Sequence, residues 1–250
     1  MSEPPHDPSA TPTRVHRVQS PDEAAATAAR RVGELIEAAV ADTGHCSLAL
    51  AGGTTPKALY ERLPAEGLPW HRVALYLGDE RAVPVDHPES NLGMAREALI
   101  DRLRGVQVYP MVTDPAEPER DAERYAALLA NGLPRSPAGL PVLDIVLLGL
   151  GADGHTASLF PGSRALEVVD RTVVAESVPN KGWRITMTRP VLDVARHRLV
   201  LATGAGKAAA VAAAIGRAHD VALPINRLTR PLEWYLDQAA ARDIDPAATR

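Results

Sequence analysis

Residues Leu143–Leu150 read LDIVLLGL, and this almost uninterrupted apolar run constrains the fold more than any other part of the sequence. A strand that is covered on both faces has such a pattern, whereas a strand with one exposed face alternates apolar and polar residues. The run is far shorter than the roughly 18 apolar residues that a membrane-spanning helix needs. It therefore predicts the central strand of a parallel sheet that is buried under helices on both faces.

Shorter apolar segments alternate with segments of helical pattern along most of the 250-residue chain. Further strands are predicted at Cys46–Ala51, Val73–Leu77, Val106–Tyr109, Thr172–Glu176, Ile185–Thr188 and Leu199–Ala202. Helices are predicted after a capping box at Ser20–Glu23, after Thr55-Pro56, from Ser90 to about Leu103, over Glu117–Leu129 and over Lys207–Arg217. Repeated strand-then-helix units with short connections predict an α/β fold, in which helices cover a mainly parallel sheet.

The domain organisation follows from where this alternation begins. Residues 1–19 are rich in Pro, Ser, Thr and Asp, so we expect a flexible tail with a short edge-strand pattern near Val15–Val18. No repeat and no long linker interrupts residues 20–250, which we expect to form a single domain. Ligands of open parallel sheets bind at the carboxyl ends of the strands, so the loops that leave the strands are where a site is expected.

Composition and charge exclude several classes of protein. Apolar residues make up 46% of the chain and charged residues 23%, which is typical of a globular protein. A net charge of −4 gives no reason to expect nucleic acid, and residues 1–20 lack the apolar stretch of a secretory signal. The lone Cys46 fits a reducing compartment, and the histidines show no metal-ligand spacing. We therefore expect a cytoplasmic protein with no metal and no membrane partner.

The first loop of interest, Ala51–Lys57, follows a predicted buried strand and contains Gly52, Gly53, Thr54 and Thr55. The glycines let the backbone approach a ligand closely, while the threonine hydroxyls and the free N–H groups of a helix start could cradle a phosphate. The alternative is a tight turn with a Thr-Pro helix start that needs no ligand.

The second loop follows the strand Val73–Leu77 and reads Gly78-Asp79-Glu80-Arg81. Carboxylates and an arginine at the carboxyl end of a strand are placed where a substrate would meet them. The alternative is a surface turn with a local salt bridge of little energetic value.

The third loop, Gly149–Ser158, begins with the pattern G-x-G-x-x-G of dinucleotide-binding loops. We reject that interpretation because Pro161-Gly162 interrupts the long helix that the pattern should open, and because the preceding strand lies mid-chain. Asp153 and His155 are more informative, since an aspartate can orient an imidazole that gains and loses protons near neutral pH. The alternative is a histidine whose hydrogen bonds are satisfied by the local backbone.

A fourth loop, Thr203–Lys207, again joins a predicted strand to a helix. It is not a Walker A loop, because Leu201 replaces the first glycine and Ala208 replaces the magnesium-binding hydroxyl residue. Lys207 is one of only three lysines, and a cation in the first turn of a helix is mildly unfavourable unless an anion binds there. The alternative is a lysine exposed to solvent.

Taken together, these loops resemble the 6-phosphogluconolactonases. The matching segments are Leu48–Leu63, Leu77–Ile100, Leu143–Ser163, Arg184–Leu192 and Ala202–Val211, with the D-E-R-x-V-P and G-x-D-G-H-T-A-S-L-F-P stretches as the most specific parts. The resemblance implies a Rossmann-like α/β/α sandwich like that of glucosamine-6-phosphate deaminases and ribose-5-phosphate isomerases. It implies no metal and no cofactor. The segments Pro179–Trp183 and Leu223–Arg227 match the family less closely.

The resemblance also implies a reaction, the hydrolysis of 6-phospho-D-glucono-1,5-lactone to 6-phosphogluconate in the pentose phosphate pathway. His155 would be the general base for water, Asp153 would orient its ring, and Arg81 would stabilise the oxyanion or hold Asp79 and the sugar hydroxyls. The residues implied to hold the phosphate are Gly52, Gly53, Thr54, Thr55, Lys207 and Arg184. A small sugar phosphate is the expected partner, and the chain is expected to be a monomer or a weak homo-oligomer.

Two alternatives remain open. A related sugar-phosphate deaminase or isomerase would have a glutamate that supports the histidine at the position of Phe160, and phenylalanine cannot relay a proton. A sugar-phosphate-sensing regulator would normally carry a helix-turn-helix, for which residues 1–20 are too few.

Overall fold

The structure is a computed structural model that describes residues 14–64, 66–216, 222–229 and 231–244. Within these residues, seven strands form one sheet in the order β1-β10-β9-β6-β2-β3-β5, and every pair of neighbours is parallel. Their bounds are β1 Arg14–Val18, β10 Glu233–Asp237, β9 His197–Ala202, β6 Ile145–Gly149, β2 Cys46–Leu50, β3 Val73–Leu77 and β5 Gln107–Val108. The predicted α/β fold with a mainly parallel central sheet is confirmed.

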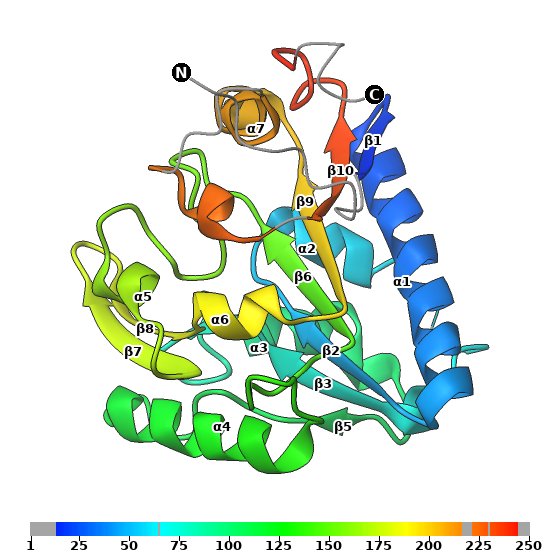
Figure 1. The fold of residues 1–250 in the computed structure, drawn as a ribbon. Helices are drawn as coiled ribbons and strands as arrows, with labels where there is room; N and C mark the ends of the chain where they lie inside the picture. Colours follow the sequence, from blue (N-terminus) through cyan, green and yellow to red (C-terminus); the bar gives the residue numbers. More distant parts are fainter. Residues whose placement is uncertain (1–13, 65, 217–221, 230, 245–250) are drawn as a thin grey trace.

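Five helices begin close to the predicted positions, although α3 ends before the predicted Leu103; α5 and α6 were not predicted. Their bounds are α1 Pro21–Thr43, α2 Thr54–Tyr60, α3 Asn91–Ala98, α4 Pro118–Gly132, α5 Arg164–Glu167, α6 Arg189–Asp193 and α7 Ala208–Ile215. Short 3-10 turns are η1 Trp70–Arg72, η2 Ile100–Arg102, η3 Ala205–Lys207 and η4 Pro224–Arg227. Helix α1 packs on α2, and both contact strands of the large sheet, while α4 and α6 lie on the other side (Figure 1).

Three strands form a second, antiparallel sheet in the order β4-β8-β7, with bounds β4 Asp79–Arg81, β8 Gly182–Met187 and β7 Val173–Val178. Two of the predicted strands therefore lie outside the main sheet. The connection between them is a tight turn in which Asn180 and Gly182 have positive φ, and such a turn joins antiparallel neighbours directly. The small sheet packs on α4 (Figure 1).

The predicted tail needs a correction at its end. Arg14–Val18 pairs in parallel with β10 along five residues, so this part of residues 1–19 belongs to the sheet. The main-chain bonds to β10 stabilise the short edge strand that the Val15–Val18 pattern indicated. The rest of the predicted tail, residues 1–13, lies outside the described residues.

The strand order of the large sheet indicates where a ligand site is expected. From β2 the chain proceeds to β3 and β5 on one side, and then returns to β6 on the other side of β2. Loops that leave β2 and β6 therefore diverge, and this is the point of an open sheet where ligands bind. At the opposite end of the same strands, Ser47 and Asp144 exchange buried hydrogen bonds of 2.7 to 2.9 Å, which fix how β2 and β6 lie against each other.

Candidate active site

A pocket of about 210 Å³ lies where the four predicted loops meet. Most of the residues that the sequence indicated line it, namely Gly52, Gly53, Thr54, Thr55, Asp79, Arg81, His155 and Lys207. Asp153 and Arg184 do not line the pocket, but each lies beside a residue that does. The four loops thus form one site.

The His155 ring is held from three sides. Its Nδ1 lies 2.5 Å from Oδ1 of Asp153, which also accepts a hydrogen bond from the His155 main-chain N–H at 3.2 Å. Gly151 lies against the ring, where an ideal Cβ would be 2.0 Å from Nδ1, so a larger residue would displace the imidazole. Phe160 packs on the ring with the two centroids 4.5 Å apart. The second glycine of the G-x-G pattern is therefore required by a histidine.

The protonation of the pair follows from the charge on Asp153. Burial alone would raise its pKa, but the hydrogen bonds from His155 outweigh burial and hold the pKa of Asp153 below its ordinary value of 3.8. Asp153 is therefore an anion at neutral pH, and it accepts a hydrogen bond from the Nδ1–H group of His155. The lone pair of the ring is then on Nε2, where it can take a proton from water.

Phe160 is the one phenylalanine of the chain and is buried. Phe160 also contacts Lys181, whose ammonium group lies 5.1 Å from the centroid of the Phe160 ring. Lys181 lies in the turn between β7 and β8, so the small sheet reaches the histidine loop through this aromatic ring. Phenylalanine has no group that can relay a proton, so this side chain only packs on the histidine.

The two carboxylates of the Asp-Glu-Arg segment have different roles. Asp79 lines the pocket and accepts a 2.6 Å hydrogen bond from the Ser158 hydroxyl. Glu80 points away and accepts hydrogen bonds from the main-chain N–H groups of Asn91 and Leu92 at 2.7 and 2.8 Å. Burial raises the pKa of Glu80 despite these bonds. Glu80 thus holds the start of α3, a role that the sequence analysis did not predict.

Arg81 and Arg184 occupy directly opposite positions on β4 and β8, so their side chains share one face of the small sheet. The guanidinium of Arg81 donates to the main-chain oxygen of Glu89. Arg184 is 8% exposed, and its one side-chain hydrogen bond within the described residues is a 3.5 Å contact with the Trp183 carbonyl. Burial and repulsion from Arg81 lower the pKa of Arg184. Attraction to the carboxylates of Asp79, Glu89 and Glu80 offsets these effects only in part, so a bound anion would stabilise the cation further.

The predicted phosphate loop connects β2 to α2. Gly53 has a φ of 103°, which favours glycine, and it directly precedes the first turn of α2. The Thr55 hydroxyl lies 2.9 Å from the hydroxyl of Thr203 and so ties this loop to the one that contains Lys207. Lys207 also lines the pocket and makes no ion pair within the described part of the chain. The loop and Lys207 together offer donors and a positive charge.

Asn91, which the sequence analysis did not consider, also lines the pocket. It is 2% exposed, and its Nδ2 donates to the main-chain oxygen of Asp79 at 2.9 Å. Its position after the Ser90 helix cap is the only sequence signal that could have marked it, since Ser90 fixes where α3 begins.

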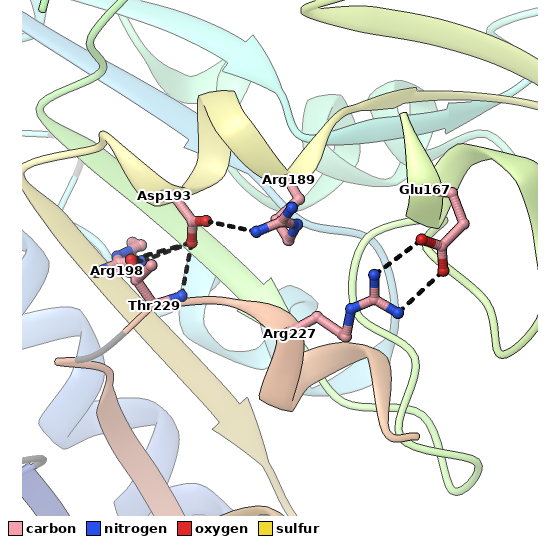
Figure 2. A network of polar contacts seen from close by, with 6 residues as sticks. All are labelled: Glu167, Arg189, Asp193, Arg198, Arg227 and Thr229. Atoms are coloured by element: carbon pink, nitrogen blue, oxygen red, sulfur yellow. Dashed lines mark hydrogen bonds and ion pairs between the residues drawn. The ribbon is translucent and has the colours of Figure 1, made fainter. Parts of the chain in front are cut away.

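The segment Leu223–Arg227 supports the histidine loop from outside. The Ile225 N–H donates to the Gly154 carbonyl at 3.1 Å, and an ideal Cβ on Gly154 would lie 2.4 Å from the Leu223 side chain. Arg227 forms two parallel hydrogen bonds of 2.9 Å with the carboxylate of Glu167 on α5 (Figure 2). The segment Leu223–Arg227, which matches the family less closely, therefore still contacts the histidine loop.

The ion pair between Asp193 and Arg198 holds the chain just after Leu223–Arg227. Asp193 accepts hydrogen bonds from Arg198 at 3.2 Å and from the main-chain N–H of Thr229 at 2.7 Å (Figure 2). Arg189 lies on the other side of Asp193, with 3.7 Å between nitrogen and oxygen. The network links α6, β9 and the chain after η4.

Known proteins support what this geometry suggests. The sequence profile described as "Glucosamine-6-phosphate isomerases/6-phosphogluconolactonase" matches residues 19–235. The chain belongs to this family. The 6-phosphogluconolactonase of Synechocystis sp. is 41% identical over 218 residues, which cover 84% of this chain and 90% of the relative. That of Mycobacterium tuberculosis is 39% identical over 232 residues, covering 88% and 93%.

Solved structures of the family agree with this assignment. The 6-phosphogluconolactonase of Trypanosoma brucei superimposes with a TM-score of 0.82 at 36% identity, covering 95% of this chain and 100% of that chain. A monomeric glucosamine-6-phosphate deaminase, 20% identical with a TM-score of 0.77, shares the fold. The resemblance inferred from the motifs is confirmed. In the described residues, every helix is too short or too polar to cross a membrane.

Proposed function

We propose that this family member hydrolyses 6-phospho-D-glucono-1,5-lactone to 6-phosphogluconate, with His155 as the general base. The observation that carries the proposal is the Asp153–His155 pair, because it leaves a basic Nε2 at a pocket that also contains cationic groups. The sequence relatives named as 6-phosphogluconolactonases match along more than four fifths of the chain.

In the proposed reaction, Nε2 of His155 takes a proton from water while the water oxygen attacks C1 of the lactone. The carbonyl oxygen becomes an oxyanion, which Arg81 stabilises. One such donor lowers the activation free energy by about 3 kcal/mol where water is excluded. When the carbonyl re-forms, the bond from C1 to the ring oxygen breaks. The imidazolium returns its proton to that oxygen, which becomes a hydroxyl, and the new carboxyl group ionises.

The phosphate of the substrate would be held away from the reacting carbon. Gly52, Gly53, Thr54 and Thr55 supply main-chain and hydroxyl donors, and Lys207 and Arg184 supply positive charge. An anchored phosphate fixes the lactone carbonyl against the base, so binding energy from a remote group contributes to the rate. Asp79, which lines the pocket, would accept hydrogen bonds from sugar hydroxyls.

Phe160 is the observation that separates hydrolysis from deamination. Its ring packs on His155 where the deaminase motif has a glutamate, so a carboxylate-assisted relay for ring opening is missing at this position. We propose a cytoplasmic enzyme that acts on this small sugar phosphate as a monomer or a weak homo-oligomer.

The test is a pair of assays on the purified protein. Freshly generated lactone should disappear much faster with enzyme than by spontaneous hydrolysis, which must be subtracted. Glucosamine 6-phosphate should release no ammonia. Ammonia release without lactonase activity would reverse the assignment.

A further inference from the structure

Ser158 is a buried hydroxyl residue at the end of the histidine loop, Gly149–Ser158, and the proposed reaction gives it no role. It is 3% exposed, and its Oγ–H group donates a hydrogen bond to Oδ2 of Asp79 at 2.6 Å. Among the described residues, this is the one hydrogen bond that the Asp79 carboxylate receives. The other oxygen, Oδ1, has no hydrogen bond within these residues but keeps accessible surface, so a ligand in the pocket can reach it.

The main chain of Asp79 is fixed by other contacts, so only the side chain depends on Ser158. Asp79 pairs with Thr186 across β4 and β8, and its carbonyl oxygen accepts a hydrogen bond from Asn91 at 2.9 Å. The carboxylate itself can rotate about its side-chain bonds, and each rotation would carry Oδ1 to another part of the pocket. The charge-assisted hydrogen bond from Ser158 restrains this rotation.

The backbone of the histidine loop is bent just before Ser158. Ala157 has a φ of 47°, in the left-handed region that residues other than glycine rarely adopt. It lies in a turn that is closed by a 3.0 Å hydrogen bond from the Leu159 N–H to the Thr156 carbonyl. Such a conformation costs free energy, and it persists where the surrounding contacts require it. Since His155 directly precedes this turn, the turn connects the proposed base to the carboxylate of Asp79.

We infer that Ser158 is a positioning residue, whose hydroxyl fixes the Asp79 carboxylate so that Oδ1 accepts a hydrogen bond from a hydroxyl of the bound sugar. The inference rests on the proposed function, since it concerns how that substrate is oriented. A sugar hydroxyl that does not react donates to Oδ1 both in the bound substrate and in the transition state. Loss of this contact therefore raises KM and leaves kcat nearly unchanged.

The first measurement is the steady-state kinetics of Ser158→Ala, with spontaneous hydrolysis of the lactone subtracted. We expect KM to rise about tenfold, as for the loss of one hydrogen bond to a charged group, while kcat stays within about threefold. In titration calorimetry, 6-phosphogluconate should bind about tenfold more weakly, and inorganic phosphate should bind within about twofold of wild type. General loosening of the histidine loop would instead lower kcat, because it would displace His155.

A double-mutant cycle tests whether Ser158 acts through Asp79. Asp79→Ala alone should raise KM at least as much as Ser158→Ala does. When Ser158→Ala is added to Asp79→Ala, KM should change by no more than about twofold, because the carboxylate that Ser158 positions is already gone.

Thr186→Val is the matched control for the loop. The Thr186 hydroxyl accepts a hydrogen bond from the Ser158 main-chain N–H at 3.3 Å and donates to the Met187 carbonyl, so it does not bond the carboxylate. The valine variant loses a buried contact of the same loop. It should have a lower melting temperature than wild type, and its KM should stay within about twofold.

Several outcomes overturn the inference. Ser158→Ala keeps the wild-type KM, or its loss in kcat exceeds its rise in KM; the two substitutions have independent effects in the double variant; or Thr186→Val raises KM as much. Should Ser158→Ala not fold, Ser158→Cys replaces it, and because a thiol is a weak donor, KM must again rise with kcat nearly unchanged. Failure of the proposed function is separate, because the wild-type protein would then show no lactonase activity.

Discussion

Arg184 lies directly opposite Arg81 across strands β8 and β4, so two guanidinium groups share the face of the small sheet at the edge of the pocket. Such a cross-strand pair of like charges is destabilising. Under the proposed function, the phosphate of the ligand adds to the attraction of the carboxylates of Asp79, Glu89 and Glu80 and offsets this repulsion.

Arg184→Leu should therefore reduce activity without reducing stability. We expect KM to rise at least about tenfold, since the variant loses a charge-assisted contact worth roughly 1.5–3 kcal/mol. The melting temperature should stay unchanged or rise, because a buried cation that is only partly compensated is removed. Steady-state kinetics and calorimetric melting measure the two effects.

Arg198→Leu is the matched control, because Arg198 is equally buried but is paired with Asp193 at 3.2 Å. Breaking a buried pair leaves an uncompensated charge and should lower the free energy of unfolding by about 3 kcal/mol. Equal destabilisation by both substitutions, with KM unchanged for Arg184→Leu, would show that Arg184 is structural.

Gly151→Ala should remove most of the activity. The new Cβ would lie 2.0 Å from Nδ1 of His155 and 2.4 Å from Oδ1 of Asp153, so the ring must move away from its carboxylate. We expect kcat to fall about 100-fold, as for the loss of one positioned acid-base group. Gly149→Ala, with its nearest neighbour 3.9 Å away, should have a much smaller effect. Similar losses for both variants would contradict the account.

Phe160→Leu tests how the imidazole is held. Removing the ring that packs on His155 should lower kcat about tenfold, because a slightly misplaced base transfers protons poorly, with little change in KM. Phe160→Tyr keeps the ring and should retain most of the activity. An unchanged kcat for the leucine variant would mean that Asp153 and Gly151 suffice to place the histidine.

Asp121 gives a pH dependence of stability away from the site. Burial would raise its pKa, but hydrogen bonds from Thr113, Asp114 and Arg124 lower the pKa below its ordinary value of 3.8. The unfolded chain therefore binds the proton first, so this stabilisation is present above that value and is lost as the pH falls through the folded-state pKa. Asp121→Asn should lower the free energy of unfolding by about 2 kcal/mol at neutral pH. In denaturant titrations, the difference from wild type should shrink below about pH 4; a constant difference would contradict this.

The sequence was most informative where candidate binding or catalytic residues lie in the loop that directly follows a strand. The loops with Gly52, Lys207 and His155 each leave a strand of a parallel sheet, so topology alone brings their ends to one edge. Local pattern also led to the rejection of dinucleotide binding, and the structure gives the second glycine of that pattern another role, which is to leave room for His155.

Other features depended on contacts that no local pattern contains. The Asp-Glu-Arg segment was interpreted as a loop, but it is a strand, and side chains alternate along a strand. Asp79 and Arg81 therefore face the pocket while Glu80 faces α3. The opposition of Arg81 and Arg184 depends on the register of β4 with β8, and the orientation of Asn91 depends on the Asp79 backbone, so neither was predictable from sequence spacing.

The most direct test of the central claim is the turnover of His155→Ala, measured together with its affinity for 6-phosphogluconate. The account predicts that kcat falls about 1,000-fold after spontaneous hydrolysis is subtracted, while product binding stays within about threefold. A variant that retains the full kcat would contradict the assignment of His155 as the base.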